Sequence, residues 1–247
     1  MNRFFLDPQL FSDKGVKFSE NIEHQILSVL RLRSGDEVEV LDNQGYLYRV
    51  VLDVDRDKKS VYGQFLSKET AMTEPSIQII LCFGLSNRDK VEWILQKGTE
   101  IGVSAFSPFI SSRTLVRSID LSEKKKVRWE KIIREAAEQS QRGRLPKLNR
   151  PQRFETCLSK TCNENRLSLI AWEDDHADQV NIAQSLHGFE GSSIALFVGS
   201  EGGFSGEEIN LAKEAGCRVI TLGARILRME TAAIVFPAVV LHDLGEL

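Results

Sequence analysis

The stretch from Ile194 to Ala232 constrains the fold more than any other part of the chain. It contains two apolar segments that we expect to be strands, and each runs into a glycine-bearing loop followed by a helical segment. In an open α/β sheet, loops at the carboxyl ends of neighbouring strands form the ligand site. We therefore predict two neighbouring strands and a binding site made by their two loops. Two ordinary strand-to-helix turns are the alternative.

Glycines recur in both loops, at Gly199, Gly202, Gly203 and Gly223. Without a Cβ atom the backbone turns sharply and approaches a ligand closely. The first loop is not a Walker loop, because no Gly-Lys-Ser/Thr follows, and its third glycine is misplaced for a dinucleotide fingerprint. The pattern favours a ligand held by backbone groups between apolar walls. The candidate wall residues are Leu222, Ile226 and Leu227.

Four charged residues lie in or beside the two loops. Glu201 and Glu230 are each interpreted as a ligand-binding group, a general base or a charge at a helix start, and the last reading suits Glu230 best. Arg228 could hold a phosphate or carboxylate through its planar fork. A surface salt bridge is the alternative, which we adopt for Arg225.

The sequence pattern predicts two domains: a small β-rich domain over residues 1–72 and a larger domain of alternating strands and helices over residues 73–247. In the first, a short amphipathic helix over residues 22–30 precedes several short strands, which suggest a small barrel. In the second, strict alternation implies a mostly parallel sheet with helices on both faces. The expected strands of the α/β domain include 77–83, 105–110 and 167–172, and its helices 90–101, 122–141, 178–186 and 230–244.

Charge is distributed unevenly along the 247 residues, although the net charge is only −3. The segment 113–153 contains 13 Lys or Arg against 5 Asp or Glu, whereas the segment 154–247 contains 6 against 14. A clustered basic segment is typical of proteins that bind a polyanion. A solvated helix face is the alternative.

Several classes of protein are disfavoured. No apolar run has the roughly 20 residues of a membrane helix, and the N-terminus lacks a signal peptide's apolar core, so we expect a cytoplasmic protein without a membrane partner. The four histidines have no ligand spacing, so we expect no metal. No nucleophile elbow is present. The scattered cysteines, which we expect to be reduced and mostly buried, are Cys82, Cys157, Cys162 and Cys217.

A family resemblance follows from the order of several motifs. The segments 197–205 (Phe-Val-Gly-Ser-Glu-Gly-Gly-Phe-Ser) and 222–232 (Leu-Gly-Ala-Arg-Ile-Leu-Arg-Met-Glu-Thr-Ala) resemble the signature of SPOUT methyltransferases. With Lys97-Gly-Thr-Glu-Ile-Gly-Val and Glu135-Ala-Ala-Glu-Gln-Ser, they resemble the ribosomal RNA small-subunit methyltransferase E family, which methylates N3 of a uridine in 16S rRNA. Arg3-Phe-Phe resembles the family's opening.

The resemblance implies a fold, a cofactor and partners. Residues 1–72 would form a PUA-like β-barrel that binds RNA, and residues 73–247 a SPOUT domain with a deep trefoil knot, a feature that is otherwise nearly absent from proteins. The cofactor would be S-adenosylmethionine, the partner 16S rRNA in the small ribosomal subunit, and the enzyme a homodimer. Two positions depart from the family pattern: Ser200 replaces a common proline, and Met229 a common threonine.

The resemblance also implies roles for individual residues. Arg228 would stabilise the charge that develops on the uracil ring, and Glu201 is the candidate proton acceptor. The cofactor would be held by Gly199, Glu201, Gly202, Gly203, Leu222, Gly223, Ile226, Leu227, Glu230, Thr231 and Ala232. The RNA backbone would be contacted by Arg3, Arg31, Arg113, Arg117, Arg142 and Arg144. A non-catalytic RNA-binding module is the second hypothesis, and a nicotinamide-dependent oxidoreductase, which lacks its fingerprint here, a distant third.

Overall fold

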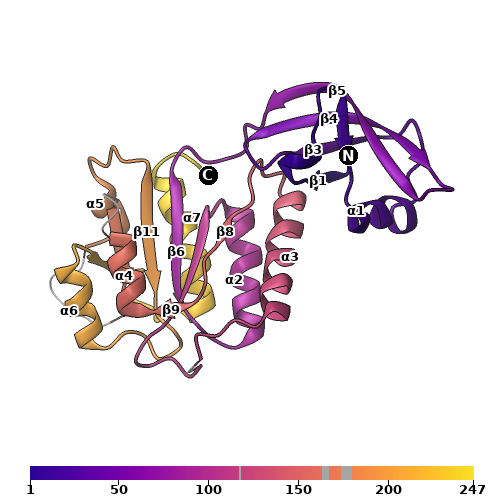
Figure 1. The fold of residues 1–247 in the computed structure, drawn as a ribbon. Helices are drawn as coiled ribbons and strands as arrows, with labels where there is room; N and C mark the ends of the chain where they lie inside the picture. Colours follow the sequence, from indigo (N-terminus) through magenta and orange to yellow (C-terminus); the bar gives the residue numbers. More distant parts are fainter. Residues whose placement is uncertain (117, 163–166, 174–179) are drawn as a thin grey trace. The chain divides into compact units, whose positions relative to one another are not determined.

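The computed structural model describes residues 1–116, 118–162, 167–173 and 180–247. The chain divides into two compact units (Figure 1). The first contains residues 1–74 and 137–145, and the second contains residues 75–136 and 146–247. The return of residues 137–145 to the first unit is a feature that the sequence did not predict.

A five-stranded sheet forms the first unit, and its strands are β1 (Arg3–Phe5), β2 (Gly15–Lys17), β3 (Glu37–Leu41), β4 (Tyr46–Asp55) and β5 (Ser60–Thr70). Their order is β1-β3-β4-β5-β2, with β1 parallel to β3 and the other pairs antiparallel. Alternation along β3 places Val38 and Val40 in the core and leaves Glu37 outside. The predicted helix is confirmed as α1 (Glu20–His24), which continues in a π-helical turn, Gln25–Val29. A 3₁₀ turn, Pro8–Leu10, follows β1.

Residues 137–145 pack on the opposite face of this sheet. Neighbouring side chains on a strand point to opposite faces, so Phe4 joins the main core of the unit while Phe5 joins a second cluster that contains Ala137. Arg142 Nη2 lies 2.6 Å from Glu74 Oε2, and the backbone amide of Gly143 donates to Glu74 Oε1. Apolar contact and this ion pair together hold the returning segment.

The second unit contains a parallel sheet with strands in the order β12-β10-β11-β6-β7-β8, and β9 also pairs with β7. Its strands are β6 (Gln78–Gly84), β7 (Ala105–Ile110), β8 (Lys147–Leu148), β9 (Gln152–Arg153), β10 (Leu167–Ala171), β11 (Ser193–Val198) and β12 (Arg218–Ile220). Its helices are α2 (Arg88–Ile101), α3 (Glu123–Gln139, whose last three residues belong to the first unit), α4 (Phe154–Cys162), α5 (Ile182–Leu186), α6 (Gly206–Glu214) and α7 (Met229–Asp243). The predicted parallel α/β sheet is confirmed.

Helices cover both faces of this sheet, with α2 and α7 on one side and α4 and α6 on the other (Figure 1). Because β6 is buried on both faces, Leu81 joins the core under α2 and α7, while Cys82 joins the core under α4 and α6. Gly102 ends α2 with φ +117°, as its position predicted. The helix expected over residues 178–186 begins at Ile182, and residues 178–179 lie outside the described residues.

The strand order corrects one prediction. The two strands that carry the glycine loops, β11 and β12, are not neighbours, because β10 pairs with both and lies between them. The neighbour of β11 on its other side is β6. Helix α2 follows β6 and helix α6 follows β11, and these two helices cover opposite faces of the sheet. The switch point of the topology therefore lies between β6 and β11. The carboxyl ends of β6 and β11 are therefore the expected ligand site.

The four cysteines, scattered in sequence, meet in the core under α4 and α6. All are free thiols, and Cys162 Sγ lies 3.3 Å from Cys217 Sγ. Burial raises the pKa of the Cys82 thiol. Within the described ranges no group of three or more His, Cys, Asp or Glu side chains is placed to hold a metal ion. No helix in that part of the chain combines the length and apolarity that crossing a membrane requires.

Candidate active site

The first glycine loop leaves β11 in a tight turn. The amide of Gly203 donates to the carbonyl of Ser200 at 2.9 Å, and Gly203 has φ +65°, a conformation that glycine adopts without steric cost. Ser205 then caps α6, with its side chain accepting from the amide of Glu208. The serine at position 200 makes a contact that proline could not, because its hydroxyl donates to the Arg113 carbonyl.

The glycines of this loop make room for the protein's own chain. A Cβ atom on Gly202 would lie 2.9 Å from the Cβ atom of Arg113, and one on Gly199 would lie 2.9 Å from the Gly203 carbonyl carbon. Gly84, at the end of β6, likewise leaves space for the Ser200 backbone. The loop after β11 is thus packed tightly against both β6 and the segment at Arg113.

The second loop, residues 221–228, has fewer such contacts. Gly223 has φ +105°, yet a Cβ atom there would meet no described atom within 4 Å. Of the predicted walls, Leu222 and Leu227 pack against the core cluster under α7, whereas Ile226 is 84% exposed. Two of the three predicted wall residues thus contact the core, and the third lies in solvent. Arg225 is also exposed.

Lys90 joins the two halves of the site. Its Nζ atom lies 3.1 Å from Oε1 of Glu201, in the first loop, and 3.4 Å from Oε2 of Glu230, in the first turn of α7. The hydroxyl of Ser86, which follows β6, also hydrogen-bonds Glu201. We call Ser86, Lys90, Glu201 and Glu230 the lysine–carboxylate cluster. It lies at the carboxyl ends of β6 and β11, where the topology predicts a ligand.

Two members of this cluster, Glu201 and Lys90, have shifted pKa values. Burial by itself raises the pKa of Glu201, but hydrogen bonds from Ser86, its own backbone and Lys90 bring that pKa below its usual value. The hydrogen bond to Glu201 in turn raises the pKa of Lys90. Glu201 is therefore ionised at neutral pH and is a weaker base than an ordinary glutamate. Glu230 Oε2 is buried and makes no hydrogen bond among the described residues, since the contact with Lys90 is an ion pair only.

The remaining predicted residues fall at the start of α7. Arg228 occupies the N-cap position, is exposed and has no ion-pair partner in the part of the chain that the structure describes. Met229, in place of a threonine, is buried in the core, which suits a thioether better than a hydroxyl. Thr231 is half-buried and Ala232 buried. No sequence pattern pointed to Lys90, which is one polar residue of α2 beside the buried Val91. Ser86 could have been found, because it follows the carboxyl end of a strand.

The arginines predicted to bind RNA separate into two groups. Arg31, Arg113 and Arg144 are exposed. Arg142 is only 3% exposed and ion-paired with Glu74, and Arg3 is held by Glu39 at 2.7 Å. The charges of Arg142 and Arg3 already have carboxylate partners inside the first unit, so these two arginines have less free charge to offer RNA. Arg117 lies outside the described residues.

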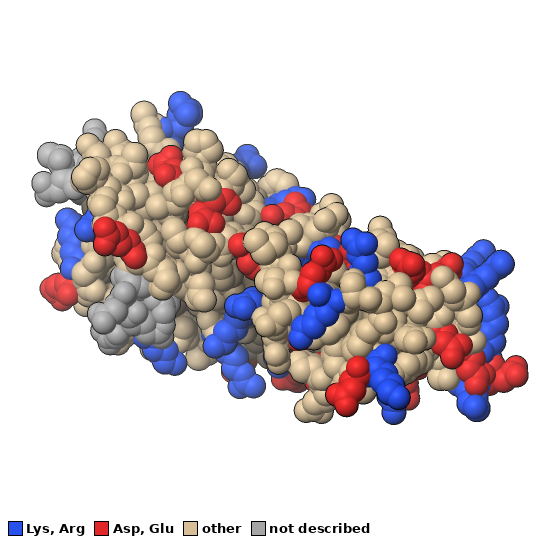
Figure 2. Space-filling model, turned by 90° about the horizontal axis from the view of Figure 1, so that it is seen from above, with Lys and Arg blue, Asp and Glu red and all other residues tan. Residues whose placement is uncertain are grey.

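The basic segment is also less cationic than its composition suggests. Arg128 pairs with Glu92, and α3 contains two further pairs along its own surface, Lys126–Glu130 and Lys131–Glu135. Basic and acidic side chains are interspersed over the face drawn in Figure 2. The charge count along the sequence overstated the positive surface because it could not see these pairs.

Comparison with known proteins adds a family. The RNA methyltransferase domain family matches residues 73–241. A curated relative, ribosomal RNA small subunit methyltransferase E of Bacillus subtilis, is 34% identical over 85% of this chain and 82% of its own length. The protein of the same name from Synechocystis is 31% identical over 99% of this chain and 77% of its own length.

Solved structures agree with these relatives. The ribosomal RNA small subunit methyltransferase E of Neisseria gonorrhoeae, bound to S-adenosylmethionine, superposes with a TM-score of 0.85 at 31% identity and covers 98% of this chain and 97% of its own. A methyltransferase of Legionella pneumophila, in complex with the same cofactor, has a TM-score of 0.81 at 26% identity, covering 98% and 97%.

Proposed function

The chain belongs to the RNA methyltransferase family and is an S-adenosylmethionine-dependent ribosomal RNA methyltransferase of the small subunit methyltransferase E group; from this premise we propose that it methylates N3 of one uridine in 16S rRNA. The observation that carries the site assignment is the lysine–carboxylate cluster. It links the first glycine loop to the helix that follows the second loop, which supports a single site made by the two motifs of the sequence.

The residues of the cluster fit the cofactor. Glu230 Oε2 is buried and lacks a hydrogen bond among the described residues, and Glu201 is an ionised acceptor. Both suit the ammonium and hydroxyl donors of S-adenosylmethionine, and Leu222 and Leu227 would provide apolar surface for its adenine ring. When bound, the cofactor supplies an activated methyl group on a sulfonium centre.

Arg228 is the proposed catalytic residue. The N3 position of uracil is a poor nucleophile until its proton leaves, so the anion that results must be stabilised. An exposed guanidinium with no ion-pair partner among the described residues is available to donate to a uracil carbonyl oxygen. When the N3 proton leaves, its electron pair stays on N3 and would form the bond to the methyl carbon, while the carbon–sulfur bond would break and leave its electron pair on the sulfur of the departing S-adenosylhomocysteine. Orientation of the base accounts for several kcal/mol of the barrier.

Glu201 is better suited to holding the cofactor than to accepting the proton. Its lowered pKa and its ion pair with Lys90 make it a weak base. We assign it to cofactor binding, and we assign the N3 proton to solvent water. Of the RNA-binding residues, we retain Arg31, Arg113 and Arg144, which are exposed.

The finer features of the family fold belong to the same proposal. The five-stranded sheet of the first unit is proposed to be a PUA-like, RNA-binding domain, and the second unit to contain the deep trefoil knot at its cofactor loops. Two observations support a homodimer. Helix α7 is apolar nearly all round, with Val235 36% exposed, and Trp93, on the helix that packs against α7, is 51% exposed. A ribosomal substrate supports a cytoplasmic location.

Methyl transfer tests this proposal directly. Purified protein is incubated with tritiated S-adenosylmethionine and either naked small-subunit RNA or assembled small subunits, and the RNA is digested to nucleosides. The expected product is N3-methyluridine from one site. Label on ribose or on another base would assign the enzyme to a different methylation, and absence of cofactor binding at millimolar S-adenosylmethionine would favour a non-catalytic RNA-binding module.

A further inference from the structure

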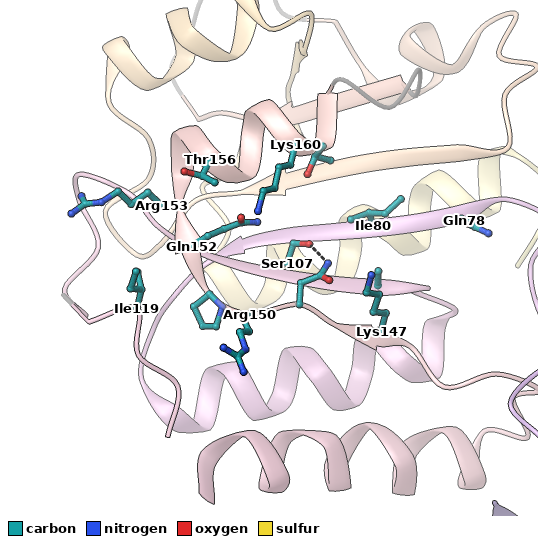
Figure 3. A pocket seen from close by; sticks show the side chains of 14 residues that line it. Gln78, Ile80, Ser107, Ile119, Lys147, Arg150, Gln152, Arg153, Thr156 and Lys160 are labelled. Atoms are coloured by element: carbon teal, nitrogen blue, oxygen red, sulfur yellow. Dashed lines mark hydrogen bonds between the residues drawn. The ribbon is translucent and has the colours of Figure 1, made fainter. Parts of the chain in front are cut away.

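A second cavity lies in the second unit, away from the lysine–carboxylate cluster (Figure 3). Its volume is about 740 Å³, within the range of ligand pockets. The buried residues Ile80 and Ser107, from β6 and β7, form its floor, and Thr156 and Lys160 line it from α4. None of the four cluster residues lines it. The cavity is therefore separate from the site assigned to methyl transfer.

Positive charge surrounds this cavity. Among the residues that the structure describes, the lining contains no Asp or Glu. It contains four exposed cations: Lys147, Arg150, Arg153 and Lys160. None of the four has a carboxylate within ion-pair distance in the described ranges, unlike Arg128, which is paired with Glu92. Figure 3 shows Lys160 extending from α4 towards Gln152, while Arg150 and Arg153 point outward at the rim. Such a rim favours an anionic ligand.

The spacing of the cations indicates more than one phosphate. Lys147 lies opposite Ala105 in the sheet, and Arg153 lies opposite Ile110. These two positions are five residues apart on β7, which corresponds to about 17 Å along a strand. A spread of this length suits successive phosphates of a nucleic-acid strand better than a single phosphate group.

Uncharged polar groups supply the means to contact bases. Gln78, Asn149 and Gln152 carry amides that both donate and accept, and Asn149 Nδ2 already donates to Ser107 Oγ at 2.8 Å. Proteins recognise RNA bases mainly in single strands, where the base edges are free to form hydrogen bonds inside a pocket. We propose that this cavity binds a single-stranded segment of the RNA substrate, with its phosphates on the cationic rim and one base on the amides. The identification of the ligand as RNA rests on the proposed function, whereas the cavity and its positive charge are observed independently of that function.

The first test removes charge from the rim. Binding of a fluorescein-labelled single-stranded RNA of about ten nucleotides is measured by anisotropy for the full-length double variant Lys147→Gln/Lys160→Gln. The matched control is Lys124→Gln/Lys213→Gln, which removes two exposed cations elsewhere in the same unit. We expect the rim variant to bind about tenfold more weakly than the control, with the salt slope reduced by about 1.4 because each lost contact contributes about 0.7. Equal affinities for the two variants would overturn the proposal.

The second test places a negative charge inside the cavity at almost constant shape. Asn149→Asp retains the hydrogen bond with Ser107, because the new carboxylate accepts from the hydroxyl, and Asn210→Asp on the surface of α6 is the control. Only Asn149→Asp is expected to weaken RNA binding, by about threefold or more. Uridine monophosphate serves as a competitor. If it displaced the RNA with an affinity equal to that of the RNA itself, the cavity would be a mononucleotide site and the proposal would be refuted.

Methyl transfer separates this inference from the proposed function. If wild-type protein forms no N3-methyluridine but the cavity variants still lose RNA affinity, the function fails and the cavity assignment stands. If methylation proceeds and the cavity variants bind RNA and turn it over like their controls, the cavity assignment fails and the function stands. Cofactor affinity, measured by calorimetry, is expected to be unchanged in all four variants.

Discussion

The two glycine loops look alike in sequence but differ in structure. The loop after β11 is anchored at several points, through Gly202 against Arg113, Ser200 against Gly84, and Glu201 against Ser86 and Lys90. The loop after β12 is open at Gly223 and exposes Ile226. Gly199 and Gly202 in the first loop therefore serve close packing, whereas Gly223 serves a left-handed backbone conformation in free space. Close packing explains glycines in the first loop only, although Gly203 there shares the left-handed conformation of Gly223.

This difference implies a division of roles. An anchored loop holds its carboxylate in place before a ligand arrives, and such preorganisation lowers the entropy lost on binding. A loop with an exposed arginine at its end suits a substrate that comes from solution. We expect changes in the first loop to affect the cofactor and changes at Arg228 to affect methyl transfer.

The largest expected effect is at Arg228. Arg228→Ala should lower the rate of methyl transfer about 100-fold or more, as loss of one charge-stabilising donor does in other enzymes, and should leave cofactor affinity within about twofold. Single-turnover transfer and calorimetry measure the two quantities. Arg225→Ala, in the same loop and also exposed, should behave like wild type. A parallel fall in cofactor affinity would show that Arg228 does not act on the substrate side.

Gly202→Val should have the next largest effect. The new side chain would lie 2.9 Å from Arg113 at its first atom alone, so the anchored loop must shift and cofactor affinity should fall about tenfold or more. Gly206→Val is the control, because a Cβ atom there meets nothing within 4 Å. Calorimetric titration with S-adenosylhomocysteine measures the change. Wild-type affinity in Gly202→Val would remove this loop from the cofactor site.

Lys90→Met should have a moderate effect on both stability and cofactor binding. At pH 7 we expect a loss of about 1 kcal/mol in the free energy of unfolding, because the pair is partly exposed, and about threefold weaker cofactor binding. The pKa of Glu201 is lowered by folding, so the stability difference should shrink as the pH falls below 4.5, the ordinary glutamate pKa. The raised pKa of Lys90 predicts the same shrinkage above pH 10.5.

Lys97→Met serves as the control for that variant, because Lys97 pairs with Glu100 on the same helix at 2.8 Å. It should cost a similar amount of stability without changing cofactor affinity. Equal cofactor affinities in Lys90→Met and wild type would mean that Lys90 does not hold the two halves of the site together.

The smallest effect is expected at Glu92, away from both loops. Its hydrogen bonds with Arg128 and Arg88 lower its pKa to about 2. Glu92→Gln should therefore reduce the free energy of unfolding at pH 7 by about 1 kcal/mol or less, given that both arginines are more than half exposed. The difference should be constant above pH 4.5 and should disappear as the pH approaches about 2. Urea unfolding between these pH values measures it, and a difference that grows on acidification would contradict the assignment.

Local patterns predicted most of the elements correctly. Period-two alternation identified β3, continuous apolar runs identified β6, β10 and β11, and a C-terminal glycine identified the end of α2. These features depend on residues that are close in sequence, so the printed chain contains the information. The two glycine loops were predicted for the same reason, since each is a turn between a strand and a helix.

The partners of each charged side chain required the tertiary structure. Arg142 and Arg3 were predicted to contact RNA, but each has a carboxylate partner inside the first unit. Glu74 is 68 positions from Arg142 in sequence and Glu39 is 36 positions from Arg3, and no periodicity connects residues so far apart. For the same reason, composition could not distinguish the paired cations of α3 from the unpaired ones around the cavity.

The sequence by itself determined the class of the fold, the two loops and, through the order of its motifs, the family and its cofactor. Tertiary structure decided which strands are neighbours: β6, rather than β12, lies beside β11. That pairing brings Ser86 and Lys90 to Glu201 and Glu230, more than a hundred residues away. Hydrogen bonds between strands can form in many strand orders. Burial of both faces of the sheet selects one strand order among these. The site is a consequence of that choice.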